Sequence, residues 1–511
     1  MQISPDFDTF SRLHGAGKPA LVWTTLVADL ETPVSAMLKL ADGRPNSFLL
    51  ESVEGGAVRG RYSVIGLKPD LIWRCYGDRA ETNRRARVDA DAFEAEPVGT
   101  LASLKSLIAE CRVDTPSPLP PMACGLFGYM GYNMVGLMER LPDKNPDTLS
   151  IPDGLFLRPT VVCIFDSLED RVIVVTPIWP DRDRQGGTIP ATGADARAAF
   201  DRAGERLAEV LADFERTPPY RREAAAAVAE PPVPQGNMTR GEFMAVVGTA
   251  KDYIHAGEVF QVVPSMRFSV PFRLPPFALY RALRRLNPSP FLFFLDYGEF
   301  AVVGSSPELM VRVRDGTVTI RPLAGTRRRG ATPDEDKKLG EELLADPKER
   351  AEHLMLVDLA RNDIGRVAQI GTVKVTEQFV IERYSHVMHI CSNTEGRLDP
   401  RHTALDALVA GFPAGTLSGA PKVRAMEVID ELEVERRNLY GGAIGYFAGD
   451  GSMDTCIALR TAIVKDGKMI VQAGCGVVAD SDPASEYQEV LDKSRALIRA
   501  AEEAVGFAKR Q

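Results

Sequence analysis

Apolar and polar residues follow two periods along the chain, one typical of strands and one typical of helices. In the first part of the chain, strand-like runs cover residues 21–27, 62–67 and 160–179, and the last run contains a turn at 167–170. Residues 196–215 instead place apolar side chains three and four positions apart, as in an amphipathic helix. We therefore expect strands, at least one hairpin and then a long helix.

A change in composition separates this part from the rest of the chain. Residues 181–194 are rich in Gly, Asp, Arg and Thr, and residues 217–237 are rich in Pro and Ala, as in loops and linkers. We therefore expect two regions. The N-terminal region would span residues 1–236 and end in a helix and linker, and the C-terminal region would span residues 237–511.

The second region is expected to begin with a helix and to continue with hairpins. Thr239 and Glu242 match a capping box, in which two side chains satisfy the first backbone N–H groups of a helix, and Gly257 suits its end. Strands and helices then follow without a regular strand–helix–strand repeat, so we expect an α+β fold with mostly antiparallel sheet. The expected strand segments are 291–304, 308–320, 441–448, 453–464 and 468–478, and the expected helices are 334–362, 402–410 and one that begins near Asp482 and Pro483.

The composition argues against several classes of protein. Apolar residues make up 45% and charged residues 26% of the 511 residues, a normal globular balance. The net charge of −9 argues against a nucleic-acid partner, and no apolar run is long enough to cross a membrane. The seven cysteines include no CxxC pair, which argues against a zinc site and for a reducing compartment. With no signal peptide at the N-terminus, the chain is expected in the cytoplasm.

Two pairs of glutamates are candidate metal ligands. Glu349 and Glu352 are three residues apart on one expected helix, and Glu486 and Glu489 repeat that spacing on another, with Lys493 one turn further. Each pair alone is typical of a solvated helix face. If both pairs face one cleft, carboxylates about 4 Å apart repel by roughly 4 kcal/mol at an effective dielectric constant near 20, and a cation relieves this repulsion. Oxygen ligands without cysteine or paired histidine favour Mg2+ over zinc.

Glycine-rich segments supply a second group of candidates. Segments 322–330, 414–422 and 472–483 place glycine where a backbone N–H group can approach a carboxylate, although such segments are more often plain turns. We expect Thr416 to precede a helix and Gly325 to end a strand. Segment 472–483 also contains Cys475, but no histidine is placed to activate it, so we do not interpret it as a nucleophile. The candidate anion contacts are Gly325, Thr326, Thr416, Gly474 and Gly476.

Three single residues are notable for their surroundings. Arg460 lies within an apolar strand-like run, so it either pairs with an internal carboxylate or binds an anion. His389 lies three residues after His386, a spacing that a metal site could use, although no third ligand is apparent. Tyr440 opens an expected strand.

Taken together and in order, these segments resemble the chorismate-utilising enzymes. The similarity covers residues 20–500 and is most specific over residues 255–493. It rests on the segments LAGTRRRG, KERAEHLMLVDLARND, YSHVMHI, AGTLSGAPKVRAME, YGGAIGY, CIALRT and the QEV…K helix. The resemblance implies two packed, mostly antiparallel sheets flanked by helices, with the active cleft in the C-terminal region.

Two positions indicate which reaction of this family to expect. Members that add water carry a lysine base where this chain has Gln261, and an amide cannot deprotonate water but can hydrogen-bond ammonia. Members that use a nucleophilic lysine carry it where this chain has Ala324. This pair of residues resembles the anthranilate synthases, which implies that chorismate and ammonia give anthranilate and pyruvate in the first step of tryptophan biosynthesis. Two alternatives stay open: a synthase that stops at the aminated intermediate, and a non-catalytic tryptophan-binding regulator.

The resemblance also implies a role for each candidate. Glu308 would protonate the leaving C4 hydroxyl, His389 would do acid–base work at the pyruvate leaving group, and Gln261 would hold ammonia. The metal would be Mg2+, bound by Glu352 and Glu489, with its waters held by Glu349 and Glu486. The substrate contacts would be Gly325, Thr326, Thr416, Tyr440, Arg460, Gly474, Gly476 and Lys493.

A regulatory site and a partner are implied in the same way. Segments 48–56 and 287–294 resemble those that form the family's tryptophan feedback site, although plain core strands would also explain the apolar positions. The inhibitor contacts would be Glu51, Ser52, Pro290, Phe291, Leu292, Ile444, Tyr446 and Cys456. The residues that depart from the common family pattern are Phe291, Leu292, Pro264 and Met266. No glutaminase domain is recognisable, so a separate glutamine amidotransferase subunit is implied, in a hetero-oligomer.

Overall fold

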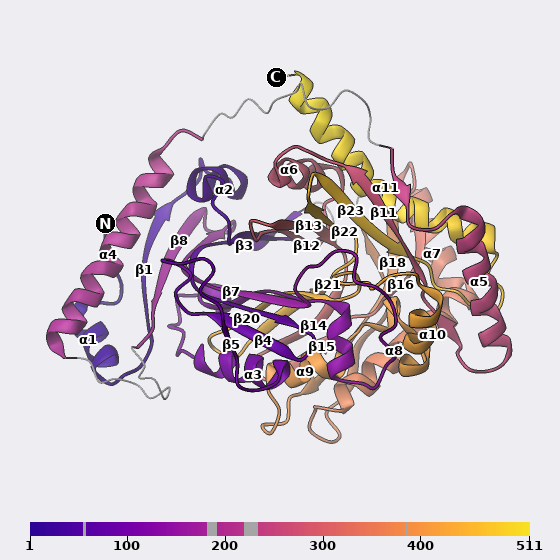
Figure 1. Cartoon of the computed structure of the whole chain (residues 1–511), viewed down its shortest axis with the longest axis horizontal. Helices are drawn as coiled ribbons and strands as arrows, with labels where there is room; N and C mark the ends of the chain where they lie inside the picture. The colour runs from indigo at the N-terminus through magenta and orange to yellow at the C-terminus, as the bar shows by residue number, and fades with distance from the viewer. Residues whose placement is uncertain (55–57, 181–191, 219–232, 385–386, 511) are drawn as a thin grey trace.

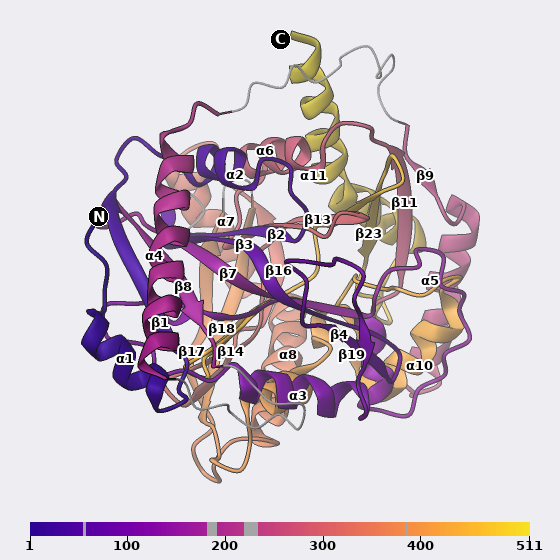
Figure 2. The same cartoon turned by 60° about the vertical axis from the view of Figure 1, so that its left-hand side comes forward.

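The computed structural model describes residues 1–54, 58–180, 192–218, 233–384 and 387–510. Within these ranges, helices lie on the outside of a layered β-structure, and both views show strands from the two halves of the chain running through the middle of the molecule (Figures 1 and 2). No helix of the described ranges is long and apolar enough to span a membrane. Most of the loop expected at 181–194 and of the linker expected at 217–237 lies outside the described residues.

The helices begin where the sequence supplies caps. The Thr239 side chain accepts the N–H of Glu242, and the Glu242 side chain accepts the N–H of Thr239, so the expected capping box is confirmed. The helix expected over 334–362 is instead two helices, because Asp346 ends the first and caps the second, with Pro347 in its first turn. The helices are α1 Phe7–Gly15, α2 Pro33–Ala41, α3 Thr100–Glu110, α4 Gly193–Glu215, α5 Arg240–His255, α6 Pro276–Leu286, α7 Pro333–Ala345, α8 Pro347–Gly365, α9 Ala404–Gly411, α10 Lys422–Leu432 and α11 Pro483–Arg510.

The described strand pairs are antiparallel, as expected for an α+β fold. In the N-terminal part the strands are β1 Ala20–Val27, β2 Ser47–Glu54, β3 Val58–Tyr76, β4 Arg79–Asn83, β5 Glu94–Ala95, β6 Gly125–Met130, β7 Gly154–Asp166, β8 Arg171–Ile178 and β9 Gln235–Gly236. In the C-terminal part they are β10 Gln261–Val262, β11 Ser265–Pro271, β12 Phe291–Asp296, β13 Phe300–Ser306, β14 Leu309–Arg314, β15 Thr317–Ile320, β16 Leu323–Arg328, β17 Lys374–Arg383, β18 Val387–Arg397, β19 Gly419–Ala420, β20 Ala443–Ala448, β21 Met453–Ile457, β22 Thr461–Lys465 and β23 Lys468–Gly474.

Strands from the two halves of the chain are hydrogen-bonded to one another. Strand β2 pairs with β12, which places Ser52 opposite Phe291, and β6 pairs with β20. The β-structure is therefore continuous across residue 237, and the division of the chain at that residue stays a prediction. The pairing of β2 with β12 joins the two segments of the expected feedback site.

Local turn signals fix most of the hairpins. Asp315 and Gly316, between β14 and β15, both have positive φ, 50° and 69°, as a two-residue hairpin turn requires. The prediction of one continuous strand over 453–464 is wrong. It is interrupted between β21 and β22, and Arg460 lies in the interruption with φ 48° rather than in the middle of a strand.

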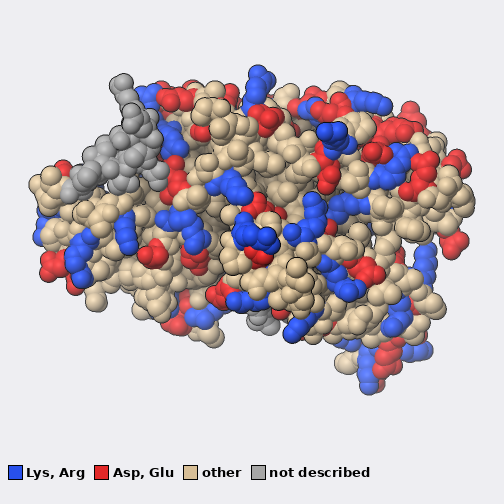
Figure 3. Space-filling view, turned by 90° about the horizontal axis from the view of Figure 1, so that it is seen from below, with Lys and Arg blue, Asp and Glu red and all other residues tan. Residues whose placement is uncertain are grey.

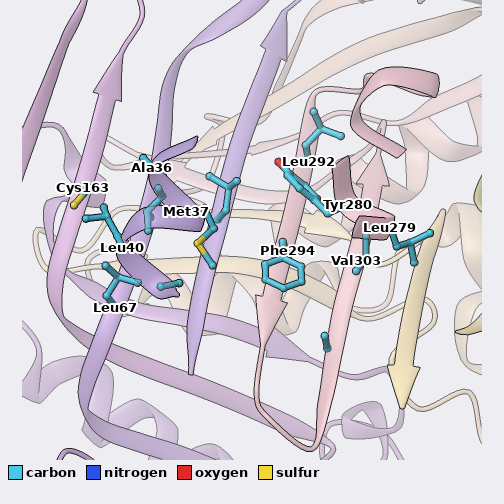
Figure 4. Packing of buried hydrophobic residues seen from close by; sticks show 14 of the residues in the cluster. Ala36, Met37, Leu40, Leu67, Cys163, Leu279, Tyr280, Leu292, Phe294 and Val303 are labelled. Carbon is cyan, nitrogen blue, oxygen red and sulfur yellow. The ribbon is translucent and has the colours of Figure 1, made fainter. Parts of the chain in front are cut away.

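Apolar residues on the inner faces of the sheets and helices form the core. Leu40 of α2 and Leu279 of α6 are fully buried, and each stabilises the fold by about 1.5–3 kcal/mol relative to an exposed side chain. Figure 4 shows how α6 supplies Tyr280 beside Leu292 of β12. On the outside, Lys and Arg are interspersed with Asp and Glu over the face shown in Figure 3.

Candidate active site

Two helices bring the predicted carboxylates to one cleft. Burial raises the pKa of Glu352 on α8, and the nearby negative charges of Glu349 and Glu489 raise it further. Glu489 comes from α11, so members of the two glutamate pairs, about 140 positions apart in sequence, act electrostatically on one another. Two of the other carboxylates have cationic partners: Arg327 Nη1 lies 3.1 Å from Glu349 Oε1, and Lys493 Nζ lies 2.7 Å from Glu489 Oε1.

The four carboxylates do not form a closed metal cage. In the described part of the chain, no group of three or more His, Cys, Asp or Glu side chains is arranged to hold a metal ion alone. Burial, and then the charge of Glu489, raise the pKa of Glu486. His386, the possible metal partner of His389, lies outside the described residues. The arrangement is an open site with oxygen donors from two helices.

Gln261 lies beside the carboxylates and is hydrogen-bonded to one of them. Its Nε2 donates to Glu352 Oε1 at 3.0 Å, and the whole residue is 3% exposed. Its Oε1 is buried and accepts no hydrogen bond within the described residues. A Cβ atom at Gly476 would lie 2.6 Å from Gln261 Nε2, so glycine is required for this close approach. The amide therefore offers a free acceptor atom beside the carboxylates.

Glu308 is a buried acid. It follows β13, and burial raises its pKa to about 8, against the opposing effects of Thr416, Arg460 and Lys493. The Thr416 hydroxyl donates to Glu308 Oε1 at 3.0 Å. Thr416 lies in a short 3₁₀ turn, Gly415–Leu417, and α10 begins only at Lys422, so Thr416 does not directly precede a helix as expected. At neutral pH this carboxyl group is mostly protonated and can donate a proton.

His389 on β18 is a neutral imidazole with one nitrogen free. Burial, and then the charge of Arg460, lower its pKa to about 4. Its Nδ1 lies 2.8 Å from the Gly325 carbonyl oxygen and 3.1 Å from Thr326 Oγ1, so Nδ1 carries the hydrogen and donates it. Its Nε2 is buried and unpartnered among the described residues, so it is free to accept a proton. Gly325 and Thr326 lie inside β16, not at its end as expected.

The predicted anion contacts surround this cleft. Burial lowers the pKa of Arg460, against the opposing effects of Tyr384 and Glu308, so a buried acid acts on this guanidinium and anion binding by Arg460 stays a prediction. A Cβ atom at Gly474 would lie 3.1 Å from the Tyr440 hydroxyl and 2.6 Å from the Pro264 carbonyl. Lys493 Nζ donates to the Gly474 carbonyl at 3.1 Å. Gly474, Tyr440 and Lys493 therefore lie together, and the charges of Arg460 and Lys493 act on Glu308 and His389.

Cys475 lies next to this pocket but has no properties of a nucleophile. It is fully buried, and burial raises the pKa of its thiol well above the ordinary value. A buried thiol with a raised pKa is mostly protonated and unreactive. This agrees with the interpretation of the sequence.

The residues of the expected feedback site lie on both faces of β12. Phe291 packs in the same cluster as Ile444, Tyr446 and Cys456, and Ser52 lies opposite Phe291. Leu292 instead packs on the other face, toward α6. Glu51 also faces α6, where it accepts hydrogen bonds from Tyr280 at 2.5 Å and from Arg284 Nη2 at 2.9 Å.

Two groups near the cleft were not predicted from the sequence. Arg437 and Glu433 form a buried ion pair next to Tyr440. The Tyr384 ring lies 5.6 Å from the His389 ring. Neither has a local signal, because a charged run such as 433–437 is usually a solvated helix end.

Comparison with known proteins is consistent with this geometry. The sequence model described as chorismate binding enzyme matches residues 57–499. Anthranilate synthase component 1 of Cereibacter sphaeroides is 56% identical over 504 residues, which is 99% of each chain. The protein of that name from Pseudomonas aeruginosa is 47% identical over 96% of this chain and 98% of its own.

Solved structures agree. Anthranilate synthase component I from Streptococcus pneumoniae is 35% identical and superposes with a TM-score of 0.74 over 86% of this chain and 92% of that one. The menaquinone-specific isochorismate synthase of Escherichia coli, 18% identical, shares the fold with a TM-score of 0.68 over 97% of this chain and 98% of that one. Given the near full-length match, this chain belongs to the family of chorismate binding enzymes.

Proposed function

We propose that this chain is the chorismate-aminating subunit of an anthranilate synthase, which makes anthranilate and pyruvate from chorismate and ammonia. The observation that carries the proposal is Gln261: a buried amide, bonded to Glu352 on one side and with a free carbonyl oxygen on the other. The full-length similarity to proteins named anthranilate synthase component 1 supports the same reaction. We expect the enzyme to work in the cytoplasm, where its seven unpaired cysteines would stay reduced.

The carboxylates fit Mg2+. They offer only oxygen donors, and the pKa of Glu352 is raised by burial and then by the charges of Glu349 and Glu489, which a divalent cation would offset. We expect Glu352 and Glu489 to hold the ion, with Glu349 and Glu486 holding its waters. When bound, Mg2+ would neutralise the ring carboxylate of chorismate. We expect Arg460, beside Tyr440, to take the enolpyruvyl carboxylate, with further contacts from Lys493 and the glycines of the pocket.

The first chemical step needs an oriented nucleophile and an acid. Gln261 Oε1 can accept one N–H of ammonia and leave its lone pair pointed at C2. Ammonia then forms a bond to C2 while the C4–O bond breaks. Protonated Glu308 gives its proton to the departing hydroxyl, which leaves as water. Because Thr416 donates to one oxygen of Glu308, the other oxygen is the one that carries the proton.

The second step needs a base. His389 is neutral, with Nδ1–H held by Gly325 and Nε2 free. It can take the proton from C2 while the C3–O bond breaks, so that the ring becomes aromatic and enolpyruvate leaves; a proton returned to its methylene carbon then gives pyruvate. Anthranilate is then the released product, rather than the aminated intermediate.

Purified alone, the chain is expected to make anthranilate from chorismate, Mg2+ and ammonium salts, and to make none from glutamine. The reason is that the side chains assigned above bind free ammonia, and none of them is assigned to release ammonia from glutamine. Anthranilate is measured by its fluorescence, and pyruvate by a coupled assay. Glutamine-dependent activity of the single chain would refute the need for a partner. Accumulation of an aminated, non-aromatic product would favour a synthase that stops at the intermediate.

The partner that supplies ammonia is expected at the mouth of the cleft. Phe260, next to Gln261, is 73% exposed, and Leu354 and Val423 are 46% and 39% exposed on the adjoining helices α8 and α10. A large exposed apolar side chain beside the proposed ammonia site, such as that of Phe260, is a candidate contact for a partner protein. We therefore propose that a glutamine amidotransferase subunit docks there, above Gln261.

We also propose that tryptophan binds against the face of the paired strands β2 and β12 that carries Ser52 and Phe291, and inhibits the enzyme. Ser52 and the apolar group of Phe291, Ile444, Tyr446 and Cys456 provide a hydroxyl and a wall for the indole. The Glu51 carboxylate is already bonded to Arg284 and Tyr280, so it can bind the amino group only by sharing these contacts. Pro290 directly precedes β12, and Leu292 lies within it.

Replacing Ser52 with leucine is expected to weaken tryptophan binding at least tenfold, a loss of about 1.4 kcal/mol, with activity within about twofold of wild type. The Ser52 side chain packs against Gly60 of β3, where an added Cβ atom would lie 2.0 Å from Ser52 Oγ. A larger residue at position 52 therefore displaces β3 at this point. Calorimetry gives the affinity, and Thr25→Leu, at an exposed position of β1, is the control. Chorismate should weaken tryptophan binding by the same factor by which tryptophan weakens chorismate binding. If wild-type protein binds no tryptophan at millimolar concentration, the regulatory proposal fails and the catalytic one stands.

A further inference from the structure

A buried ion pair lies behind the cleft, and none of the chemical steps above uses it. Arg437 Nη2 lies 2.6 Å from Glu433 Oε1, and the two side chains are 1% and 4% exposed. A pair this deeply buried is a weak source of stability, because the cost of removing two charges from water offsets most of their attraction. The contacts of the pair therefore need another explanation.

Arg437 contacts both the segment of Gln261 and the turn whose Thr416 supports Glu308. Its Nη2 donates to the Val263 carbonyl at 2.6 Å, two residues after Gln261. Its Nη1 donates to the Leu417 carbonyl at 2.7 Å, the residue after Thr416. One planar guanidinium thus bridges the Gln261 segment to the turn that supports Glu308.

Glu433 connects this bridge to the other wall of the cleft. Its Oε1 accepts the backbone N–H of Ser265 at 2.8 Å and the Ser265 hydroxyl at 2.7 Å. Ser265 pairs with Gly474 in the ladder between β11 and β23. The Arg437 guanidinium also lies 5.5 Å from the Tyr440 ring.

We propose that Arg437, oriented by Glu433, is a positioning residue that fixes the placement of Gln261 relative to Glu308. The inference rests on the proposed amination reaction, in which attack at C2 and departure from C4 need both groups aligned together. Arg437 touches no reacting atom itself. A misplacement of about 1 Å in such an arrangement costs on the order of 100-fold in rate.

The first test is Arg437→Lys, which keeps the charge but loses the fork that reaches both carbonyls and Glu433. We expect kcat for ammonia-dependent anthranilate formation to fall by roughly 30–100-fold. The KM for chorismate should stay within about threefold, because Arg460 and Lys493 still contact the substrate carboxylates. The matched control is Arg158→Lys, since Arg158 is also buried and bonded, 2.9 Å from Asp70, but belongs to β7. This control should lose stability and keep its kcat.

A second variant keeps the test decisive if the lysine variant does not fold. Glu433→Gln combined with Arg437→Met leaves no uncompensated buried charge, so it is expected to fold while losing both carbonyl contacts. It should show the same fall in kcat with an unchanged KM. A folded variant of either kind with kcat within threefold of wild type would overturn the positioning role. A wild-type chain that makes no anthranilate would instead overturn the proposed function.

Discussion

Glu308→Gln is expected to lower kcat by about 10²–10⁴-fold, the range for loss of a general acid, while chorismate binding changes little. Burial raises the Glu308 pKa to about 8, so the wild-type side chain carries a proton at pH 7. Glutamine keeps the volume and can still accept the Thr416 hydrogen bond at the same oxygen. It has no acidic proton for the departing hydroxyl. Steady-state kinetics of the two proteins at pH 7 measure the difference.

The pH dependence of wild type tests the same residue by a separate route. The protonated fraction of Glu308 falls as pH rises through about 8, so kcat should fall over that range and this limb should be missing in the variant. The free energy of unfolding of wild type should also fall as pH rises over this range. Because the folded pKa lies above the ordinary value of 4.5, the contribution of Glu308 to stability is complete below that value and is lost as pH rises to about 8. Urea unfolding should be measured between pH 5 and 9, roughly the range set by the two pKa values. Over this range the free energy of unfolding should fall less in the variant than in wild type.

Glu299→Gln provides the matched control for both measurements. Glu299 is exposed in the turn between β12 and β13, so the same chemical change there should alter neither the kinetics nor the pH dependence. Full activity of Glu308→Gln at pH 7 would remove Glu308 from the role of acid. The neighbouring Thr416 would then be a structural residue only.

Local signals in the sequence predicted most of the elements. The capping box at Thr239 and the Asp315–Gly316 turn are short-range patterns, whose energies depend only on residues within one turn. The interruption at Arg460 has no such pattern. Its positive φ is held by tertiary contact, since its carbonyl accepts the N–H of Ser305 on β13 at 3.2 Å. A sequence pattern cannot report a bond between segments 155 positions apart.

The same distinction separates the predicted from the unpredicted parts of the site. The chemistry of Glu352, Gln261 and His389 follows from residue type and family resemblance, but their partners do not. The hydrogen bond between Gln261 and Glu352 spans 91 positions. Arg437 has the same side chain as its neighbour Arg436, which pairs with Asp143 at the surface. Only the fold distinguishes Arg437, which joins two segments behind the cleft, from Arg436, which pairs at the surface.

Glu352→Gln and Glu489→Gln are each expected to lower Mg2+-dependent activity by roughly 100-fold or more, because each removes a charged oxygen from the proposed metal site. The effect of these substitutions on Tm should have opposite signs in the presence and in the absence of Mg2+. In EDTA, Glu352→Gln should raise Tm, since burial and the charges of Glu349 and Glu489 all disfavour the ionised carboxylate. In excess Mg2+, wild type should gain stability by binding and the variants should gain less.

Thermal unfolding and calorimetry with Mg2+ measure these effects independently of turnover. The control is Asp358→Asn, because Asp358 lies on the same helix α8 but its side chain is 56% exposed and pairs with Arg361. That change should alter neither metal binding nor activity. Normal Mg2+ affinity and activity in Glu352→Gln or Glu489→Gln would exclude that residue as a ligand. A fall in Tm for Glu352→Gln in EDTA would show that the hydrogen bond from Gln261 to the carboxylate outweighs burial and the repulsion by Glu349 and Glu489.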